Sequence, residues 1–234
     1  MNIVITGASK GIGKAIAGKF ATVKNNIFIC ARNEKELAET ADVIEKKYKG
    51  SHVKYFAADL SDMASVKKFA NWILSQKIDV DILVNNAGHF IPGSIYNEQE
   101  GTLEKMIHVN LYSAYYLTRA LLPSMMKRKA GHIFNMCSIA SLHAYANGGS
   151  YSISKYALMG FSKNLREEMK PFNIKVTAIY PGAVYTSSWE GSNVLPSRIM
   201  EVNDIAEMVY AASLLSAKAC VEGIVIRPFL GDLP

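Results

Sequence analysis

The sequence predicts an α/β fold in which helices cover both faces of a doubly wound parallel sheet of about seven strands. Short apolar, β-branched runs alternate along the whole chain with longer segments whose apolar residues recur at helical spacing. The strand-like runs are continuously apolar, which is typical of parallel strands that are buried on both faces.

The expected strands share a short apolar core bounded by turn residues or by helical segments. They are Asn2–Thr6, Asn26–Ala31, His52–Ala57, Ile82–Asn85, His132–Met136, Ile174–Ile179 and Gly223–Ile226. Because we find no linker or internal repeat, we expect one domain over residues 1–234. Residues 181–198, roughly, lack clear periodicity, and we expect a substrate lid there.

Composition places the chain among ordinary globular domains, since half of its 234 residues are hydrophobic and a fifth are charged. The cysteines Cys30, Cys137 and Cys220 are scattered and odd in number, which favours a reducing compartment over a disulfide framework. We see no signal peptide and no apolar stretch long enough for a bilayer. We therefore expect a cytoplasmic protein without a membrane partner.

The net charge of +6 does not predict nucleic-acid binding, because most basic residues are interleaved with acids. The compact run Lys127–Lys129 follows a long helical pattern, where cations meet the carboxyl end of the helix dipole favourably. A mildly positive surface would also attract an anionic cofactor.

A glycine-rich turn lies between the first strand and the first helix. Its glycines allow a sharp turn and a close approach to a pyrophosphate, and the new helix presents free N–H groups. The spacing is G-x-x-x-G-x-G rather than G-x-G-x-x-G, and a plain tight turn is the alternative. We expect a Rossmann-type dinucleotide site formed by Gly7, Ser9, Lys10, Gly11, Ile12 and Gly13.

The end of the second strand indicates which dinucleotide binds. An NAD-binding protein places a carboxylate there for the ribose hydroxyls, whereas this chain has Arg32. A guanidinium binds a 2′-phosphate that a carboxylate would repel, and Lys10 adds a second positive charge. We therefore expect NADP(H) rather than NAD(H). The alternatives are that Arg32 is an ordinary surface residue and that the nearby Glu34 favours NAD(H).

Seven motifs occur in a characteristic order: Thr6–Gly13, Asp59, Asn85–Gly88, Asn110, Ser138, Tyr151 with Lys155, and Pro181–Thr186. Together they resemble the short-chain dehydrogenase/reductase family in its compact single-domain form, over essentially the whole chain. The resemblance implies that Asn110, Ser138, Tyr151 and Lys155 are catalytic. It also implies a homodimer or homotetramer built on the helices around Leu103–Met126 and Ser152–Met169.

The same resemblance extends the cofactor site. It implies that Asp59 and Leu60 contact the adenine, that Asn86 lines the cofactor channel, and that Thr186 holds the nicotinamide carboxamide. The remaining implied cofactor residues are Ala87, Gly88, Pro181, Gly182 and Val184, together with Tyr151 and Lys155 themselves.

The catalytic residues also make chemical sense alone, because reduction of a carbonyl needs a proton donor for the oxygen. Of the twelve tyrosines only Tyr151 has a lysine four residues later, one helical turn away. An ammonium roughly 5 Å from a phenol favours phenolate by about 3 kcal/mol. We therefore expect Lys155 to lower the pKa of Tyr151. An incidental pair is the alternative for the spacing taken alone.

The roles follow from this chemistry. Tyr151 is the expected general acid in reduction and general base in oxidation, and Ser138 donates a hydrogen bond to the substrate oxygen. The resemblance implies that Lys155 binds the nicotinamide ribose and that Asn110 holds a water linking Lys155 to solvent. The histidines show no zinc-ligand spacing, so we expect no metal.

The candidate substrate residues are mostly aromatic, which suits a flat substrate but equally suits the small core of a loop. They are Phe90, Ile139, Tyr145, Tyr185 and Trp189. The segments Pro181–Trp189 and Ile226–Asp232 resemble bacterial sepiapterin reductases within the family. Asp232 would then pair with the N–H edge of a pterin, or else lie exposed in a loose tail.

The expected function is NADPH-dependent reduction of a small ketone or aldehyde, with a sepiapterin-like pterin as one substrate. One alternative is a 3-oxoacyl-(acyl-carrier-protein) reductase, although the tail lacks the Asp-Gly-Gly ending common there. Another is a dinucleotide-sensing regulator without turnover, which the complete set of Ser138, Tyr151, Lys155 and Asn110 disfavours.

Overall fold

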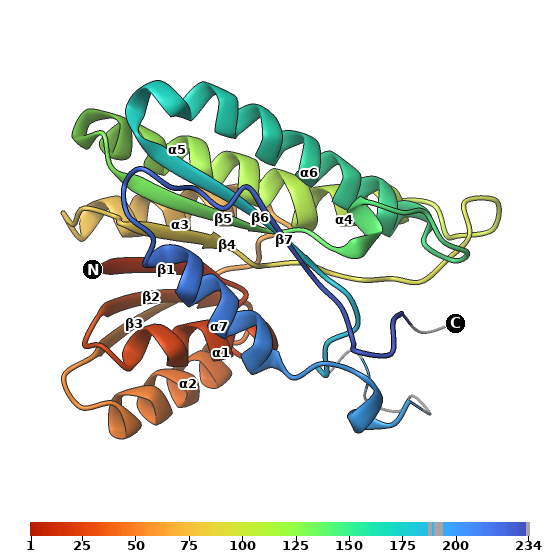
Figure 1. The fold of residues 1–234 in the computed structure, drawn as a ribbon, viewed down its shortest axis with the longest axis horizontal. Coiled ribbons are helices and arrows are strands. Elements are labelled where there is room, and N and C mark those ends of the chain that lie inside the picture. Colours follow the sequence, from red (N-terminus) through yellow and green to blue (C-terminus); the bar gives the residue numbers. More distant parts are fainter. Residues whose placement is uncertain (187–188, 190–193, 233–234) are drawn as a thin grey trace.

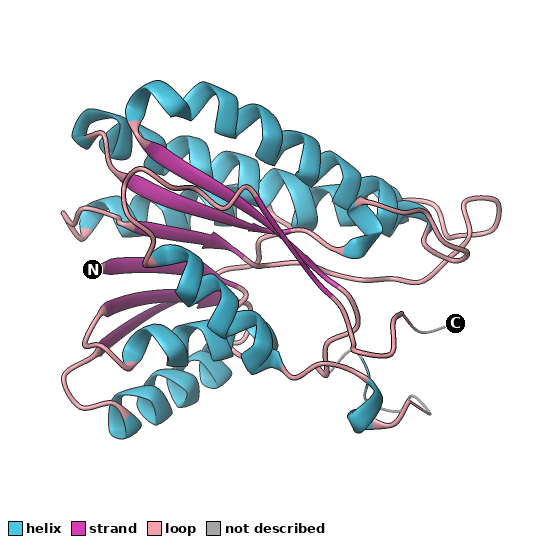
Figure 2. Ribbon diagram, viewed as in Figure 1, coloured by secondary structure: helices cyan, strands magenta, loops and turns pink. Residues whose placement is uncertain are grey.

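The computed structural model describes residues 1–186, 189 and 194–232. Seven parallel strands form one sheet in the order β3-β2-β1-β4-β5-β6-β7. Figure 2 shows this sheet between two layers of helices. The predicted doubly wound sheet is therefore confirmed.

The strands are β1 (Asn2–Thr6), β2 (Asn26–Ala31), β3 (His52–Ala57), β4 (Ile82–Asn85), β5 (Gly131–Met136), β6 (Ile174–Pro181) and β7 (Gly223–Ile226). Two differ from the predicted bounds. β5 begins one residue earlier, because Gly131 pairs with Ile174, and β6 continues to Pro181, which pairs with Ile226 of β7.

The α-helices of the described residues are α1 (Gly11–Ala21), α2 (Glu34–Lys47), α3 (Met63–Ser75), α4 (Thr102–Ile107), α5 (Ser113–Arg128), α6 (Gly149–Met169) and α7 (Val202–Ser213). Short turns are η1 (His108–Tyr112), η2 (Ile139–Ser141), η3 (Lys170–Phe172) and η5 (Pro196–Arg198). Within the described part of the chain, no helix has the length and apolar character needed to span a membrane.

Two hydrophobic cores hold the helices on the sheet. On one face Phe20 of α1, Leu37 of α2 and Ile205 of α7 pack into a core with the strands. On the other face Phe69 of α3 and Leu121 of α5 pack into a second core, which also includes α6. Figure 1 agrees with this division, with α1, α2 and α7 together in the lower part of the view and α5 and α6 together in the upper part.

The strand order reverses at β1, whose neighbours are β2 on one side and β4 on the other. At such a switch point the loops after the two central strands diverge to opposite faces and leave a crevice at the carboxyl edge. The loops in question are the glycine-rich turn after β1 and the Asn86–Gly88 segment after β4. The topology therefore places the predicted cofactor and catalytic motifs at one edge.

Candidate active site

The glycine-rich turn forms a narrow cradle. Gly7 and Gly11 have φ values of +64° and +58°, which favour glycine, and a Cβ built on Gly13 would stand 2.4 Å from the carbonyl oxygen of Gly7. Lys10, the N-cap residue of α1, makes no side-chain cap, so the first N–H groups of the helix are left for an anion. Any larger residue in place of these glycines would fill the space that a pyrophosphate needs. The cradle therefore fits a dinucleotide.

Asn86 holds this cradle in shape. Its Nδ2 donates to the carbonyl oxygens of Thr6 and Gly7, both at 2.9 Å. In return, Thr6 Oγ1 accepts the backbone N–H groups of Asn86 and Ala87 at 3.0 and 2.9 Å. The amide of Asn86, which the resemblance assigns to the cofactor channel, therefore braces the turn from the neighbouring strand.

Arg32 follows β2 and is exposed, as a residue that receives a phosphate should be. The positive charge of Arg32 acts on two neighbours at the carboxyl edge of the sheet, Asp59 and His89. Burial opposes ionisation of Asp59, but hydrogen bonds from Ser61 and the Arg32 guanidinium bring the pKa of Asp59 below its ordinary value. Burial and Arg32 together lower the pKa of His89. Arg32, Asp59 and His89 thus line one side of the crevice, and the adjacent Leu60 is buried.

The carboxylate that faces the glycine turn is Glu36 rather than Glu34. Ser9 Oγ donates to Glu36 Oε2 at 3.0 Å. The other oxygen accepts from Asn33, whose own side chain caps the Glu36 N–H. Asn33 is the N-cap residue of α2, and the spacing N-x-x-E at 33–36 is the sequence signal that would have identified Glu36.

Tyr151 and Lys155 lie on the first two turns of α6, near the end of β5. The Nζ of the buried Lys155 donates to the carbonyl oxygen of Met136 at 2.8 Å and lies 5.7 Å from the centre of the Tyr151 ring. Ser138, the N-cap of η2, hydrogen-bonds with Tyr151 and thereby favours its phenolate. The structure thus brings together three of the four residues predicted to be catalytic.

The pKa of Tyr151 shifts upward, opposite to the net lowering expected from its spacing to Lys155. Burial raises the pKa of Tyr151 to about 12, and the hydrogen bond from Ser138 only partly opposes this. Burial also lowers the pKa of Lys155 to about 8. The expectation from spacing left out the loss of hydration on burial, which is the largest cause of the upward shift.

Asn110, the fourth predicted catalytic residue, lies in the π-helical turn η1, which interrupts the helix between α4 and α5. Its Oδ1 accepts the His89 N–H at 2.7 Å, and its Nδ2 donates to the His89 carbonyl at 3.0 Å and to Ser154 Oγ at 2.8 Å. A Cβ at Gly88 would stand 3.3 Å from Lys155 Nζ and 3.4 Å from Asn110 Oδ1. Asn110 therefore joins the loop after β4 to the catalytic helix.

Two predicted substrate residues, Phe90 and Tyr145, lie beside Tyr151, and a third, Ile139, lies in the turn η2. The ring of Phe90 meets that of Tyr151 edge-on, with centroids 4.9 Å apart. Tyr145 is half-buried and close enough to act electrostatically on Tyr151. Ile139 follows Ser138 directly in η2. Two aromatic rings thus lie beside Tyr151.

The last segment of the predicted cofactor site, residues 181–186, ends beside the glycine-rich turn. A Cβ on Gly11 would lie 3.5 Å from Thr186 Cγ2, the N–H of Gly182 donates to Ile226 at 2.8 Å, and the buried Val184 bridges to Met200. Pro181 ends β6. Of the predicted lid 181–198, residues 187–188 and 190–193 lie outside the described residues.

The other predicted substrate residues lie on this segment and on the tail. Tyr185 is half-exposed, and the Trp189 N–H donates to the Thr186 carbonyl at 3.0 Å. Asp232 lies 3.4 Å from the Arg227 guanidinium, and a Cβ on Gly182 would stand 3.2 Å from its Oδ1. Arg198 donates to the carbonyl oxygens of Leu230, Gly231 and Asp232. As far as Asp232, the tail is anchored rather than loose.

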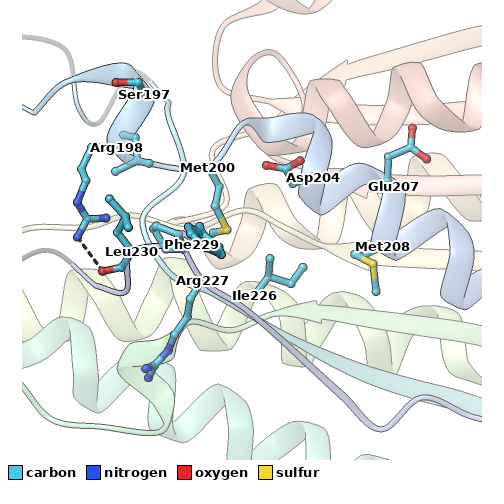
Figure 3. Close-up of a pocket in the computed structure, with 12 residues that line it drawn as sticks. Ser197, Arg198, Met200, Asp204, Glu207, Met208, Ile226, Arg227, Phe229 and Leu230 are labelled. Carbon is cyan, nitrogen blue, oxygen red and sulfur yellow. Dashed lines mark hydrogen bonds between the residues drawn. The ribbon is translucent and has the colours of Figure 1, made fainter.

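A groove of about 700 Å³ lies behind this tail (Figure 3), between residues 197–200, the first two turns of α7, and residues 226–230. Met200, Met208 and Phe229 form part of its wall. None of the predicted catalytic residues lines it, so this groove is separate from the phenol of Tyr151.

Comparison with known proteins agrees with the geometry. A family model described as short chain dehydrogenase matches residues 1–194. The chain is 32% identical to the sepiapterin reductase of Chlorobaculum tepidum, over 99% of this chain and 97% of that protein.

Solved structures give the same result. The alcohol dehydrogenase of Thermococcus sibiricus, complexed with 5-hydroxy-NADP, superposes with a TM-score of 0.91 at 28% identity and covers 100% of this chain and 98% of its own. The L-sorbose reductase of Gluconobacter frateurii, complexed with NADPH and L-sorbose, gives 0.88 at 27% identity, with coverage of 96% and 94%.

Proposed function

Since the chain belongs to the short-chain dehydrogenase family of oxidoreductases, we propose that it reduces a small ketone or aldehyde with NADPH, reversibly. The single observation that carries this proposal is the cluster of Tyr151, Lys155 and Ser138 beside the glycine cradle, at one edge of the sheet. A proton donor, a cation and a hydrogen-bond donor at this edge of the sheet can stabilise the negative charge that develops on a carbonyl oxygen during reduction.

NADP(H) is the proposed cofactor. The family neighbours from Thermococcus and Gluconobacter are complexes with an NADP derivative and with NADPH, and Arg32 and Lys10 supply the positive charge that a 2′-phosphate needs. The glycine cradle would hold the pyrophosphate, Asp59 and Leu60 the adenine, and Pro181–Thr186 the nicotinamide. When bound, the nicotinamide supplies hydride to the carbonyl carbon.

Side chains of this protein deliver the proton that the carbonyl oxygen takes up in reduction. Ser138 orients the carbonyl oxygen, Tyr151 donates the proton to it in reduction, and Lys155 compensates the charge left on the phenol. Because burial holds the pKa of Tyr151 near 12, the phenol stays protonated at neutral pH, which is the form that reduction needs. Asn110 fixes the loop after β4 against α6, the helix that carries Tyr151.

A flat carbonyl compound with a pterin ring is the proposed substrate class. The relative from Chlorobaculum tepidum is a sepiapterin reductase, Phe90 and Tyr145 offer ring faces beside Tyr151, and Asp232 is held beside Gly182. Residues 181–198 are proposed to close over it. The test is NADPH oxidation with sepiapterin, small diketones and acetoacetyl thioesters. Turnover of thioesters alone would favour the acyl-carrier-protein reductase, and binding of NADPH without turnover of any compound would favour the sensor.

We also propose a homodimer or homotetramer in the cytoplasm. The helices predicted as the interface carry a group of large side chains that are between a third and a half exposed: Tyr112, Tyr115, Tyr116, Ile153 and Tyr156. The three cysteines are free thiols, which supports a reducing compartment. Sedimentation at micromolar concentration is expected to show a dimer or tetramer, and a monomer alone would contradict the assembly.

A further inference from the structure

The loop between β4 and α4, residues 86–101, binds the start of the catalytic helix through Glu98. Ser150 Oγ donates to Glu98 Oε1, and the Ser150 N–H donates to Oε2 at 3.3 Å. Ser150 is fully buried and immediately precedes Tyr151. A carboxylate distant in sequence therefore holds both donors of the residue beside the phenol.

The first turn of α6 has no cap of its own. Its N-cap is Gly148, which has no side chain, and no acidic residue lies in the first turn. The leading N–H groups of a helix need acceptors, and a carboxylate there also offsets the positive end of the helix dipole. Glu98 supplies this acceptor and this charge.

The surrounding contacts fix the loop against the helix. The N–H of Gly93 donates to the Asn147 carbonyl at 3.1 Å, and Ser94 Oγ donates to Asn147 Oδ1 at 2.8 Å. The segments approach so closely that a Cβ on Gly149 would stand 2.5 Å from the Gly93 oxygen. The same loop carries Phe90, whose ring rests on Tyr151. The loop thus contacts both the ring of Tyr151 and the turn that bears it.

We infer that Glu98 is a positioning residue for the acid–base tyrosine: through Ser150 it orients the first turn of α6, and it holds a negative charge beside the residue that precedes Tyr151. This inference rests on the proposed role of Tyr151. The other groups that face the phenol are Lys155 on its own helix, Cys137 and Ser138 after β5, and Tyr145 in the loop before α6. Removal of the Glu98 charge would favour phenolate.

The test compares Glu98→Ala, which removes acceptor and charge, with Glu98→Gln, which keeps an acceptor oxygen. Glu100→Gln, an exposed glutamate on the same loop, is the matched control. We expect Glu98→Ala to lower kcat on the order of ten-fold, as small misplacements of a catalytic group do, with the KM for NADPH unchanged. Glu98→Gln is expected to recover most of kcat while the alkaline limb of the reduction profile moves to lower pH.

A second readout needs no turnover. Amide hydrogen exchange at residues 149–152 is expected to be faster in Glu98→Ala than in the wild type, and unchanged in Glu100→Gln. If Glu98→Ala does not fold, Ser150→Ala carries the test: it removes the hydroxyl donor to Glu98 and is expected to lower kcat, with the KM for NADPH unchanged.

Three results would overturn the inference: a wild-type kcat for Glu98→Ala per folded molecule, an alkaline limb that does not move in Glu98→Gln, or, where Glu98→Ala does not fold, a wild-type kcat for Ser150→Ala. Tyr151→Phe separates this failure from that of the proposed function. An active Tyr151→Phe variant contradicts the proposed role of Tyr151, whereas an inactive one beside normal Glu98 variants contradicts only the role of Glu98.

Discussion

Gly13 packs directly against Gly7 in the cradle after β1, so that a Cβ on Gly13 would stand 2.4 Å from the Gly7 carbonyl oxygen and 2.6 Å from Asn86 Nδ2. Gly13→Ala must therefore push the turn away from Asn86, at a cost of about 1–3 kcal/mol. We expect NADPH affinity, measured by fluorescence titration, to fall at least ten-fold.

Gly18 provides the matched control, because it lies on the same helix with no atom within 4 Å of an added Cβ. Gly18→Ala is expected to leave NADPH affinity unchanged and to stabilise the protein by up to about 1 kcal/mol. Wild-type affinity in Gly13→Ala would show that the cradle does not hold the pyrophosphate.

Cofactor selectivity should depend on Arg32 and Glu36 in opposite directions. Arg32→Ala removes a charge-assisted contact of about 1.5–3 kcal/mol, so the NADPH affinity should fall roughly ten- to hundred-fold while NADH affinity changes little. Glu36→Gln removes a carboxylate beside Ser9 and should raise the preference for NADPH several-fold. Calorimetry with both cofactors measures the ratio, and the exposed Lys35→Ala on α2 serves as the control. An unchanged ratio in Arg32→Ala would remove Arg32 from the phosphate site.

The pH dependence of the free energy of unfolding should reflect the burial of the Lys155 ammonium. Burial lowers its pKa from 10.5 to about 8, so between these values the unfolded chain binds a proton that the folded protein releases. The free energy of unfolding therefore gains a contribution that rises from pH 8 to pH 10.5. Lys155→Met lacks it. The variant should be more stable than the wild type at pH 7, and this advantage should shrink as the pH rises. Urea unfolding at several pH values checks the trend, and a constant difference would contradict it.

Much of the fold was predictable because local sequence and tertiary structure agree. Continuous apolar runs gave strand bounds that match β1, β2, β3, β4 and β7. The site motifs were predictable because they lie at strand ends, where parallel topology gathers them. The position of Tyr151 beside Lys155 and Ser138 follows from that arrangement.

Other features depend on contacts that spacing does not encode. The pKa of Tyr151 departs upward because hydration is lost in the fold, which a pairwise estimate does not include. Glu98 and Ser150 are far apart in sequence and meet only because the loop after β4 folds over α6. Glu36 instead left a local signal, its place three residues after the N-cap Asn33, beside the more obvious Glu34.

The central claim is that the phenol of Tyr151 donates the proton in carbonyl reduction, and Tyr151→Phe tests it most directly. The matched control is Tyr156→Phe, a half-exposed tyrosine on the same helix. With the best carbonyl substrate and NADPH, kcat of Tyr151→Phe is expected to fall roughly 10²- to 10⁴-fold, the contribution of general acid catalysis, while the variant still binds NADPH. A Tyr151→Phe variant with the kcat of the wild type would contradict the account.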